Sequence, residues 1–203
     1  MDHVRLLTVC TGNICRSPLA ELMLAAGLAD IPGFSVSSAG TMARDGDPMP
    51  EQAKALATTF GVDPIAHQAR YLTEQIVAES DVVFAMSREH RSQIVSLVPS
   101  KLQKTFTIRE FARLSSGLSD ERISAAATGE TLRERIDAVL RLVFAQKGVS
   151  GPIADAGLDD VVDPYRRSDA TYERSGAELA PAAFEVVRVL RLAAVPAPAE
   201  AQV

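Results

Sequence analysis

Short strand-like segments alternate with helix-like segments along this chain, and that alternation limits its fold more than any other feature. Strands are expected at about residues 4–9, 34–37, 81–86 and 104–108, and each is followed by a helical pattern or a turn. Strands that alternate with helices form parallel sheets with helices on both faces. We therefore expect an α/β fold with a parallel four-stranded sheet, whose ligands bind beyond the carboxyl ends of its strands.

Start and stop signals set the expected helices. The first is expected over about residues 19–29, with Ser17 as its N-cap and Pro18 at its first position. Others are expected over about residues 51–60, 73–79 and 109–114, and one after the cap residue Ser87. The last is expected over about residues 170–193, with an inner face formed by Leu179, Phe184, Val187 and Leu190.

The length of 203 residues suits a single domain with an appendage. We expect that domain over residues 1–193 and a disordered tail over 194–203. Residues 115–151 are expected to be a helical insertion, in which Thr131 and Glu134 form a capping box. A helix that packs on the main domain is favoured over a partner-binding face, because its apolar residues follow helical spacing: Leu132, Ile136, Val139, Leu140 and Val143.

Composition excludes several classes of function. The net charge of -5 offers no basic surface for nucleic acid. No signal sequence and no apolar run long enough to span a bilayer is visible, so we expect a soluble, cytoplasmic protein without membrane contact. Its two cysteines, Cys10 and Cys15, are too few for a disulfide framework or a zinc site. We expect free thiols, with no metal and no cofactor.

Cys10 to Ser17 (CTGNICRS) carries the strongest chemical signal. It joins a predicted strand to a predicted helix, and Gly12 and Asn13 tolerate the tight or left-handed backbone that curls N–H groups inward. Such a nest at a helix start binds anions and favours a thiolate at Cys10. Arg16 can bridge two phosphate oxygens. The alternative, a merely buried Cys10 beside a surface Arg16, is much less favoured, and the absence of Lys excludes a Walker loop.

The run CTGNICRSP, residues 10–18, resembles the low-molecular-weight protein tyrosine phosphatases. The resemblance covers about residues 4–111 and 160–192, and the stretch between is longer than the family usually has. Other segments that resemble the family are Ser38–Thr41 (SAGT), Ala66–Arg70 (AHQAR, with His67) and Asp163–Tyr165 (DPY).

The resemblance implies an enzyme that hydrolyses phosphotyrosine-type phosphate monoesters. Cys10 would be the nucleophile that becomes a phosphocysteine, Arg16 would bind the phosphoryl oxygens, and Asp163 would serve as general acid and then general base. The resemblance also implies a substrate-binding group formed by Thr11, Gly12, Asn13, Ile14, Cys15, Ser17 and Tyr165.

The resemblance further implies that Asn13 adopts a left-handed conformation fixed by hydrogen bonds with Ser38 and His67. This structural role for His67 is favoured over a role as base beside Cys10, because the anion nest already activates the thiol. Ser17 would tune the thiolate. A reversible disulfide between Cys15 and Cys10, which would protect the nucleophile from oxidation, is a further hypothesis; an inert Cys15 is its alternative.

Asp-Pro occurs three times in the chain, so this dipeptide alone does not identify the general acid. Only Asp163-Pro164 has a following aromatic residue and a position just before the last helix. Asp159 and Asp160 are the alternative candidates, since a general acid must reach the ester oxygen from a flexible loop.

The rim of the expected pocket departs from the family pattern. Residues 42–46 (MARDG) lack the usual aromatic, Arg166 replaces a second aromatic after DPY, and Ser87 replaces an acidic residue. Together with Arg44 and Arg167, Arg166 is expected to make the pocket mouth cationic. The catalytic core is intact.

Three other functions remain open from the sequence. An arsenate reductase would need an external thiol, because no cysteine follows Cys15. A protein arginine phosphatase is the second, although relatives with that activity carry Thr at the position of Ile14, and Ile suits contact with an aromatic ring better. The third is a non-catalytic phosphotyrosine-binding protein. The expected partner is a phosphotyrosine-bearing protein, such as a tyrosine kinase of surface polysaccharide export.

Overall fold

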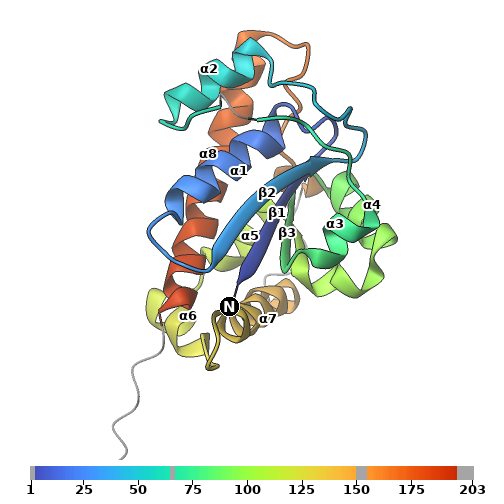
Figure 1. The fold of residues 1–203 in the computed structure, drawn as a ribbon. Helices are drawn as coiled ribbons and strands as arrows, with labels where there is room; N and C mark the ends of the chain where they lie inside the picture. The colour runs from blue at the N-terminus through green and yellow to red at the C-terminus, as the bar shows by residue number, and fades with distance from the viewer. Residues whose placement is uncertain (1–2, 65–66, 150–154, 196–203) are drawn as a thin grey trace, which may run out of the picture.

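A parallel four-stranded sheet forms the centre of the computed structural model, which describes residues 3–64, 67–149 and 155–195 (Figure 1). The strand order is β2-β1-β3-β4, so β1 has neighbours on both sides. This confirms the expected α/β fold and makes the carboxyl end of β1 the position where such sheets bind ligands. The strands are β1 (Val4–Cys10), β2 (Phe34–Gly40), β3 (Val82–Ala85) and β4 (Thr105–Thr107).

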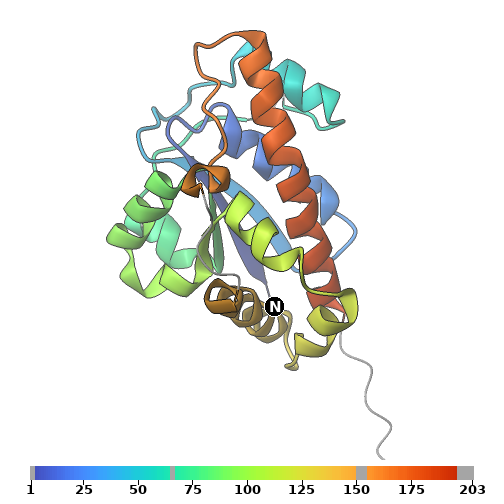
Figure 2. The same ribbon diagram turned by 180° about the vertical axis from the view of Figure 1, so that it is seen from behind.

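Helices cover both faces of the sheet, as Figures 1 and 2 show from opposite sides. One face packs mainly against α1, α5, α7 and α8, and the other packs against α3 and α4. None of the helices in the described part of the chain is long and apolar enough to cross a membrane. The helices are α1 (Arg16–Gly27), α2 (Glu51–Thr59), α3 (Glu74–Glu79), α4 (Arg88–Leu97), α5 (Ile108–Ser115), α6 (Asp120–Ala126), α7 (Leu132–Val149) and α8 (Asp169–Ala194), with 3-10 turns η1 (Pro99–Lys104) and η2 (Ala156–Asp159).

Strands β1 and β3 are nearly continuous apolar runs because both of their faces are buried, whereas β2 (FSVSSAG) and β4 (TFT) contain Ser and Thr. Leu6 and Leu7 of β1 have no exposed surface, and they belong to the cores on opposite faces of the sheet. On the larger core, the ring of Phe111 from α5 meets Phe84 and Phe106 edge to face, with centroids 5.3 Å apart in each pair. These contacts fix α5 against the carboxyl half of the sheet.

Strand β2 extends to Gly40, three residues beyond the expected end at Ser37. Its last residue pairs with Cys10 at the end of β1. A side chain at Gly40 would bring its Cβ within 2.5 Å of the Thr11 carbonyl oxygen, so only glycine lets β2 run this close to the loop after β1.

The inner face of α8 differs from the expectation at one residue. Leu179 and Leu190 are buried as expected and Val187 is partly buried, but Phe184 is 62% exposed. Each helical residue turns by about 100°, so Phe184 lies about 140° around the helix from Leu179. The prediction for Phe184 was therefore wrong. The helix continues through Ala194, and residues 196–203 of the expected tail lie outside the described residues.

The segment expected to be an insertion forms two helices, of which only α7 was anticipated. Its capping box is confirmed: Glu134 N–H donates to Thr131 Oγ1 at 3.2 Å, and Thr131 N–H donates to Glu134 Oε2 at 3.1 Å. The five apolar residues expected on its inner face are buried in the main core. Helix α6 was missed, although Ser119 caps it by accepting from Arg122 N–H.

Candidate active site

The loop between β1 and α1 curls around the sulfur of Cys10. This side chain is buried at the carboxyl end of β1, with 2% of its surface exposed. The Asn13 N–H donates to Cys10 Sγ at 3.3 Å, and the Ser17 hydroxyl lies 2.9 Å from the same sulfur. Polar donors around a sulfur stabilise its anionic form, so the local structure suits a thiolate nucleophile.

Helix α1 begins at Arg16, so the prediction that Ser17 is its N-cap was wrong. Cys15 occupies the cap position, and no side chain caps the helix. The Ser17 hydroxyl is fully buried and faces Cys10 instead, where it also accepts from Asn13 Nδ2 at 3.0 Å. Pro18 is tolerated because N–H groups of the first turn have no partner within the helix. The earlier start brings the positive end of the helix to the loop.

Asn13 is the point at which the loop reverses direction. Its φ of 53° is in the left-handed region as expected, whereas Gly12 is not among the described residues with positive φ. Asn13 Nδ2 donates to Ser38 Oγ at 2.7 Å, and the Nε2–H of His67 donates to the Asn13 carbonyl oxygen at 2.7 Å. These bonds hold the unusual backbone conformation, and they agree with the structural role preferred for His67.

Two more residues support Asn13 and were not assigned this role from the sequence. The backbone N–H of Arg70 donates to Asn13 Oδ1 at 2.9 Å, and its Nε donates to the Ser38 carbonyl oxygen at 2.6 Å. Glu21, on α1, accepts a hydrogen bond from Ser38 Oγ. Arg70 is part of the AHQAR segment, but Glu21 carries no local signal that would have revealed its partner.

The guanidinium of Arg16 lies beside Cys10 and is almost fully buried. Nη1 donates to the Val161 carbonyl oxygen at 3.1 Å, and Nη2 lies 2.9 Å from Asp163 Oδ2. Nη2 also donates to Thr11 Oγ1, at 3.4 Å. Nε is buried without a hydrogen-bond partner among the described residues. Because a buried donor without a partner is costly, Nε is a donor that an incoming oxyanion would satisfy.

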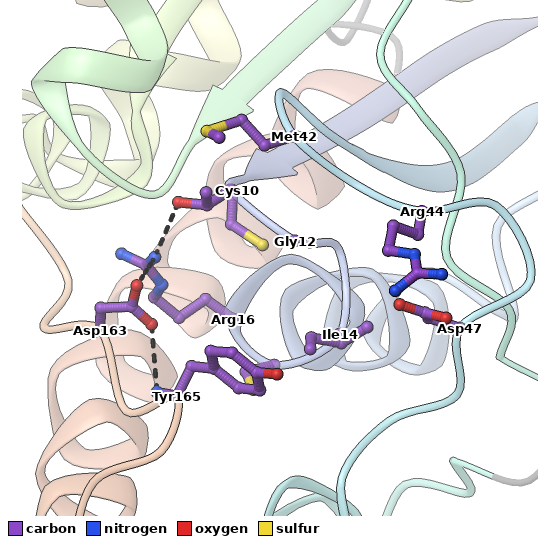
Figure 3. Close-up of a pocket in the computed structure, with 11 residues that line it drawn as sticks. Cys10, Gly12, Ile14, Arg16, Met42, Arg44, Asp47, Asp163 and Tyr165 are labelled. Atoms are coloured by element: carbon purple, nitrogen blue, oxygen red, sulfur yellow. Dashed lines mark hydrogen bonds and ion pairs between the residues drawn. The ribbon is translucent and has the colours of Figure 1, made fainter.

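Asp163 reaches the site from the loop between η2 and α8. Its side chain is 51% exposed, and Oδ1 accepts from the Tyr165 N–H at 3.2 Å while Oδ2 faces Arg16 (Figure 3). The alternative acids are directed elsewhere. Asp159 is buried and forms two hydrogen bonds with Arg113, at 2.9 and 3.0 Å, and Asp160 pairs with Arg88 at 3.2 Å. Both pairs hold the loop that carries Asp163.

A pocket of about 250 Å³ opens above Cys10 (Figure 3). All three residues predicted to be catalytic line it, whereas Asn13 and Ser17, predicted to bind substrate, are buried behind its wall. His90, which the sequence analysis did not single out, lies behind Thr11 and is buried. The lining is formed by Cys10, Thr11, Gly12, Ile14, Cys15, Arg16, Met42, Arg44, Asp47, Asp163 and Tyr165.

The rim is less cationic than expected. Arg44 lines the mouth together with the carboxylate of Asp47, and Figure 3 shows the two side chains next to each other. The guanidinium of Arg166 lies over the Tyr165 ring, 5.1 Å from its centroid, where the aromatic face attracts it. Arg167 is not among the lining residues. The exposed Met42 stands in the segment where the aromatic is missing.

Cys15 is a very different thiol from Cys10. It is buried, and its Sγ lies 3.8 Å from the Tyr172 hydroxyl. Burial raises the pKa of Cys15 to about 12, so its thiol stays protonated at neutral pH. A protonated thiol is a weak nucleophile, and the disulfide with Cys10 therefore stays a prediction that requires deprotonation of Cys15.

This geometry, a buried cysteine and arginine at a pocket beyond the end of β1, agrees with the sequence relationships of the chain. A family model described as "Low molecular weight phosphotyrosine protein phosphatase" matches residues 5–149. The chain belongs to this family. The match includes the Cys10 loop and ends before Asp163, so the role of Asp163 depends on the geometry above.

Two curated relatives with different named activities each match about half of this chain. A protein-arginine-phosphatase of Geobacillus stearothermophilus is 35% identical over 113 residues, which are 56% of this chain and 74% of the relative. A probable low molecular weight protein-tyrosine-phosphatase, EpsP, of Ralstonia nicotianae is 37% identical over 105 residues, 52% of this chain and 70% of the relative. Among solved structures, the YwlE arginine phosphatase of G. stearothermophilus has a TM-score of 0.65 and 26% identity, and the match covers 93% of each chain.

As in a cysteine-dependent phosphatase, the site combines three capabilities in one cavity. Cys10 Sγ is a buried nucleophile with hydrogen-bond donors around it. Arg16 Nε, which has no hydrogen-bond partner in the described part of the chain, forms a preorganised receptor for oxyanions together with the loop N–H groups and the start of α1. Asp163 is a half-exposed carboxyl at the same cavity, where it can reach a leaving group. Together they suit in-line displacement at phosphorus.

Proposed function

We propose that this protein hydrolyses phosphotyrosine-type monoesters on proteins through a phosphocysteine on Cys10. The observation that carries the proposal is the convergence of Cys10, Arg16 and Asp163 on one pocket of about 250 Å³. Arg16 Nε supports it further, because this donor has no partner within residues 3–64, 67–149 and 155–195 and a phosphoryl oxygen would complete the hydrogen bonding of the guanidinium.

In the first step the Cys10 thiolate attacks phosphorus, a P–S bond forms, and the P–O bond to the leaving group breaks. Arg16 Nε and Nη2 donate to the phosphoryl oxygens and stabilise the charge that they carry in the transition state. When the phosphoryl group takes Nη2, the ion pair between Nη2 and Asp163 Oδ2, 2.9 Å long in the free protein, is released. The released Asp163 carboxylate takes up a proton from solvent, and the resulting carboxylic acid gives that proton to the leaving oxygen as the P–O bond breaks.

In the second step a water molecule attacks phosphorus opposite the sulfur. The Asp163 carboxylate takes a proton from this water as the P–O bond forms, and the P–S bond breaks to regenerate the thiolate. The Ser17 hydroxyl, 2.9 Å from Cys10 Sγ, donates to the departing sulfur. Inorganic phosphate then leaves, and no external cofactor enters this sequence.

A second candidate is a protein arginine phosphatase, because a relative of that name is 35% identical. The position that distinguishes the two is Ile14, which lines the pocket and is partly buried. An apolar, branched side chain packs well against an aromatic ring, whereas a guanidinium group gains little from it. Ile14 therefore favours phosphotyrosine as the substrate.

Substrate comparison tests the proposal. We expect purified protein to hydrolyse p-nitrophenyl phosphate and phosphotyrosine peptides with a higher kcat/KM than phosphoarginine peptides, and not to reduce arsenate. Cys10→Ser should abolish turnover while it keeps the fold, as judged by circular dichroism. Ile14→Thr should lower the preference for phosphotyrosine over phosphoarginine. Turnover by Cys10→Ser, or a higher kcat/KM for phosphoarginine in the unaltered protein, would contradict the proposal.

For the natural substrate we propose a phosphotyrosine-bearing protein, such as a tyrosine kinase of surface polysaccharide export. The support is the family resemblance and relatives named as protein-tyrosine-phosphatases. Cys10→Ser retains the oxyanion receptor and should act as a substrate trap. Proteins captured from the native cell by this variant, and released by vanadate, should carry phosphotyrosine. Enrichment of proteins that carry phosphoarginine would contradict the proposal.

A further inference from the structure

His90 connects the start of α4 to the loop around Cys10. It is the third residue of α4 and only 4% exposed. Its Nδ1 lies 2.8 Å from the hydroxyl of Ser87, the N-cap residue of the same helix, and its Nε2 lies 2.9 Å from Thr11 Oγ1. Both ring nitrogens thus have a hydroxyl partner, and the imidazole bridges the helix cap and the loop.

The bridge continues from Thr11 to the guanidinium. Thr11 Oγ1 accepts from Arg16 Nη2 at 3.4 Å, a long bond whose acceptor is held in place by the shorter contact with His90. A hydroxyl has one proton and two lone pairs, so Thr11 can donate to His90 and still accept from Arg16. If Nε2–H instead donates to Thr11, the second lone pair of Oγ1 remains for Arg16. Either tautomer keeps the acceptor in front of Nη2.

His90 is suited to this role because it stays neutral. Burial, and after it the positive charge of Arg16, lower the pKa of His90 to about 4. Neutral imidazole has one donor and one acceptor, which match the two hydroxyl groups of Ser87 and Thr11. A cation at this position would lie close to Arg16 and repel its positive charge.

The orientation of Arg16 decides which of its donors meets the substrate. Val161 O accepts from Nη1, and Nη2 faces both Asp163 Oδ2 and Thr11 Oγ1. When the phosphoryl group displaces Asp163 in the proposed reaction, Val161 O and Thr11 Oγ1 remain as partners of the guanidinium. With the guanidinium plane held on these two sides, Nε remains the buried donor without a partner among the described residues. Small errors in the orientation of such a group reduce rates strongly, because transition-state bonds depend on aligned geometry.

We propose that His90 is a positioning residue for phosphoryl transfer, which acts through the Thr11 hydroxyl to hold the Arg16 guanidinium in the orientation that binds the phosphoryl oxygens. This inference rests on the proposed phosphatase function. His90 itself does not touch the substrate, since it lies behind Thr11 and is not among the residues that line the pocket.

Two amide substitutions separate the two hydrogen bonds of the ring. The amide of Gln reaches the position of Nε2, whereas the shorter Asn reaches only that of Nδ1. We expect His90→Gln to keep kcat/KM for p-nitrophenyl phosphate within about threefold of the unaltered protein, and His90→Asn to lose about tenfold, near the upper end of what one neutral hydrogen bond contributes. Thr11→Val should lose about tenfold as well, and Thr11→Ser, which keeps the hydroxyl, should largely restore it.

Vanadate binding supplies a readout that a merely structural role would not move. Vanadate adopts the geometry of the phosphoryl transition state, so its inhibition constant should rise in His90→Asn by about the same factor as kcat/KM falls. The double variant Thr11→Val/His90→Asn should be within about threefold of either single variant, because both changes break one bridge.

Ile94→Val provides the matched control on α4. Ile94 is fully buried in the smaller core, between the sheet and helices α3 and α4. Its truncation should lower the melting temperature without changing kcat/KM or vanadate inhibition. Three results would overturn the inference. His90→Gln could be as impaired as His90→Asn, or the double variant Thr11→Val/His90→Asn could lose about a hundredfold in kcat/KM. The third is a His90→Asn variant with unchanged kcat/KM and unchanged vanadate inhibition. A protein that hydrolyses no phosphoester would instead contradict the proposed function, and direct calorimetry of vanadate binding would still test the bridge.

Discussion

Replacement of Asp163 by alanine should make hydrolysis depend on the leaving group. With Asp163 present, the leaving oxygen of an aryl phosphate is protonated as the P–O bond breaks, so the product leaves as a neutral phenol. In Asp163→Ala the phenolate must leave unprotonated, which weakly acidic phenols do poorly and p-nitrophenol does well. We therefore expect kcat/KM, which reports formation of the phosphocysteine, to fall steeply only for phosphates of weakly acidic phenols such as tyrosine.

The expected size follows from two contributions of Asp163. General acid catalysis contributes roughly 100- to 10,000-fold, or about 2.7–5.4 kcal/mol of barrier. Its ion pair with Arg16, at 2.9 Å, is half exposed, with 51% of the Asp163 side chain accessible. Such a pair contributes at most about 1 kcal/mol, so its loss should change phosphate affinity by no more than about fivefold. The acid effect is therefore much larger than the electrostatic one.

The assay is a series of aryl phosphates whose phenols differ in acidity, measured with the unaltered protein and with Asp163→Ala. The logarithm of kcat/KM should depend weakly on phenol acidity in the former and strongly in the latter. Asp169→Ala, which removes an exposed carboxylate from the start of α8, is the matched control and should resemble the unaltered protein. An equal loss across all leaving groups would refute the assignment of Asp163 as the acid.

Three further outcomes are expected. The raised pKa of Cys15 keeps its thiol protonated at neutral pH, so the Cys10–Cys15 disulfide should form faster after one equivalent of peroxide as the pH rises from 7 to 9. A rate of disulfide formation, followed by mass spectrometry, that does not change with pH would contradict this. Burial lowers the pKa of His90 from 6.5 to about 4, so the unfolded chain protonates this imidazole at a higher pH than the folded protein does. The free energy of unfolding should therefore fall by about 3 kcal/mol as the pH drops from 6.5 to 4. In His90→Gln the free energy of unfolding should depend less steeply on pH over this range, and the same pH dependence in both proteins would contradict the linkage. Phe111→Ala should cost about 3–5 kcal/mol of unfolding free energy, whereas Phe184→Ala should change it by less than about 0.5 kcal/mol, and equal losses would contradict the packing of α5 and α8.

The sheet and its nucleophile loop were predictable because their signals are local. Strands β1 and β3 are short, mostly apolar runs, since both faces of the sheet are covered and no polar alternation is needed there. Cys10 and Arg16 belong to one short segment whose spacing alone brings them around an anion. The capping box of α7 is also a local signal, and the structure contains it.

The errors at Ser17 and His90 occurred where contacts in the folded structure decide the outcome, and the error at Phe184 came from misreading the local helical period. Ser17 has the propensity of an N-cap, but the buried sulfur of Cys10 takes its hydroxyl instead. Phe184 was placed on the inner face because it is apolar, although the helical period puts it outside. His90 was missed because its partner Thr11 lies 79 residues earlier in the chain, and only the assembled sheet brings the two together.

The covalent step at Cys10 is the central claim, and trapping of the phosphoenzyme tests it most directly. Asp163→Ala, mixed with p-nitrophenyl phosphate and quenched within milliseconds, should accumulate phosphocysteine, because the first step needs no acid with this leaving group and the second step lacks its base. After trypsin digestion, fragmentation of the peptide from Leu6 to Arg16 distinguishes Cys10 from Cys15. We expect the phosphoryl group on Cys10. Turnover without phosphate on Cys10, or with phosphate on a different residue, would contradict the mechanism.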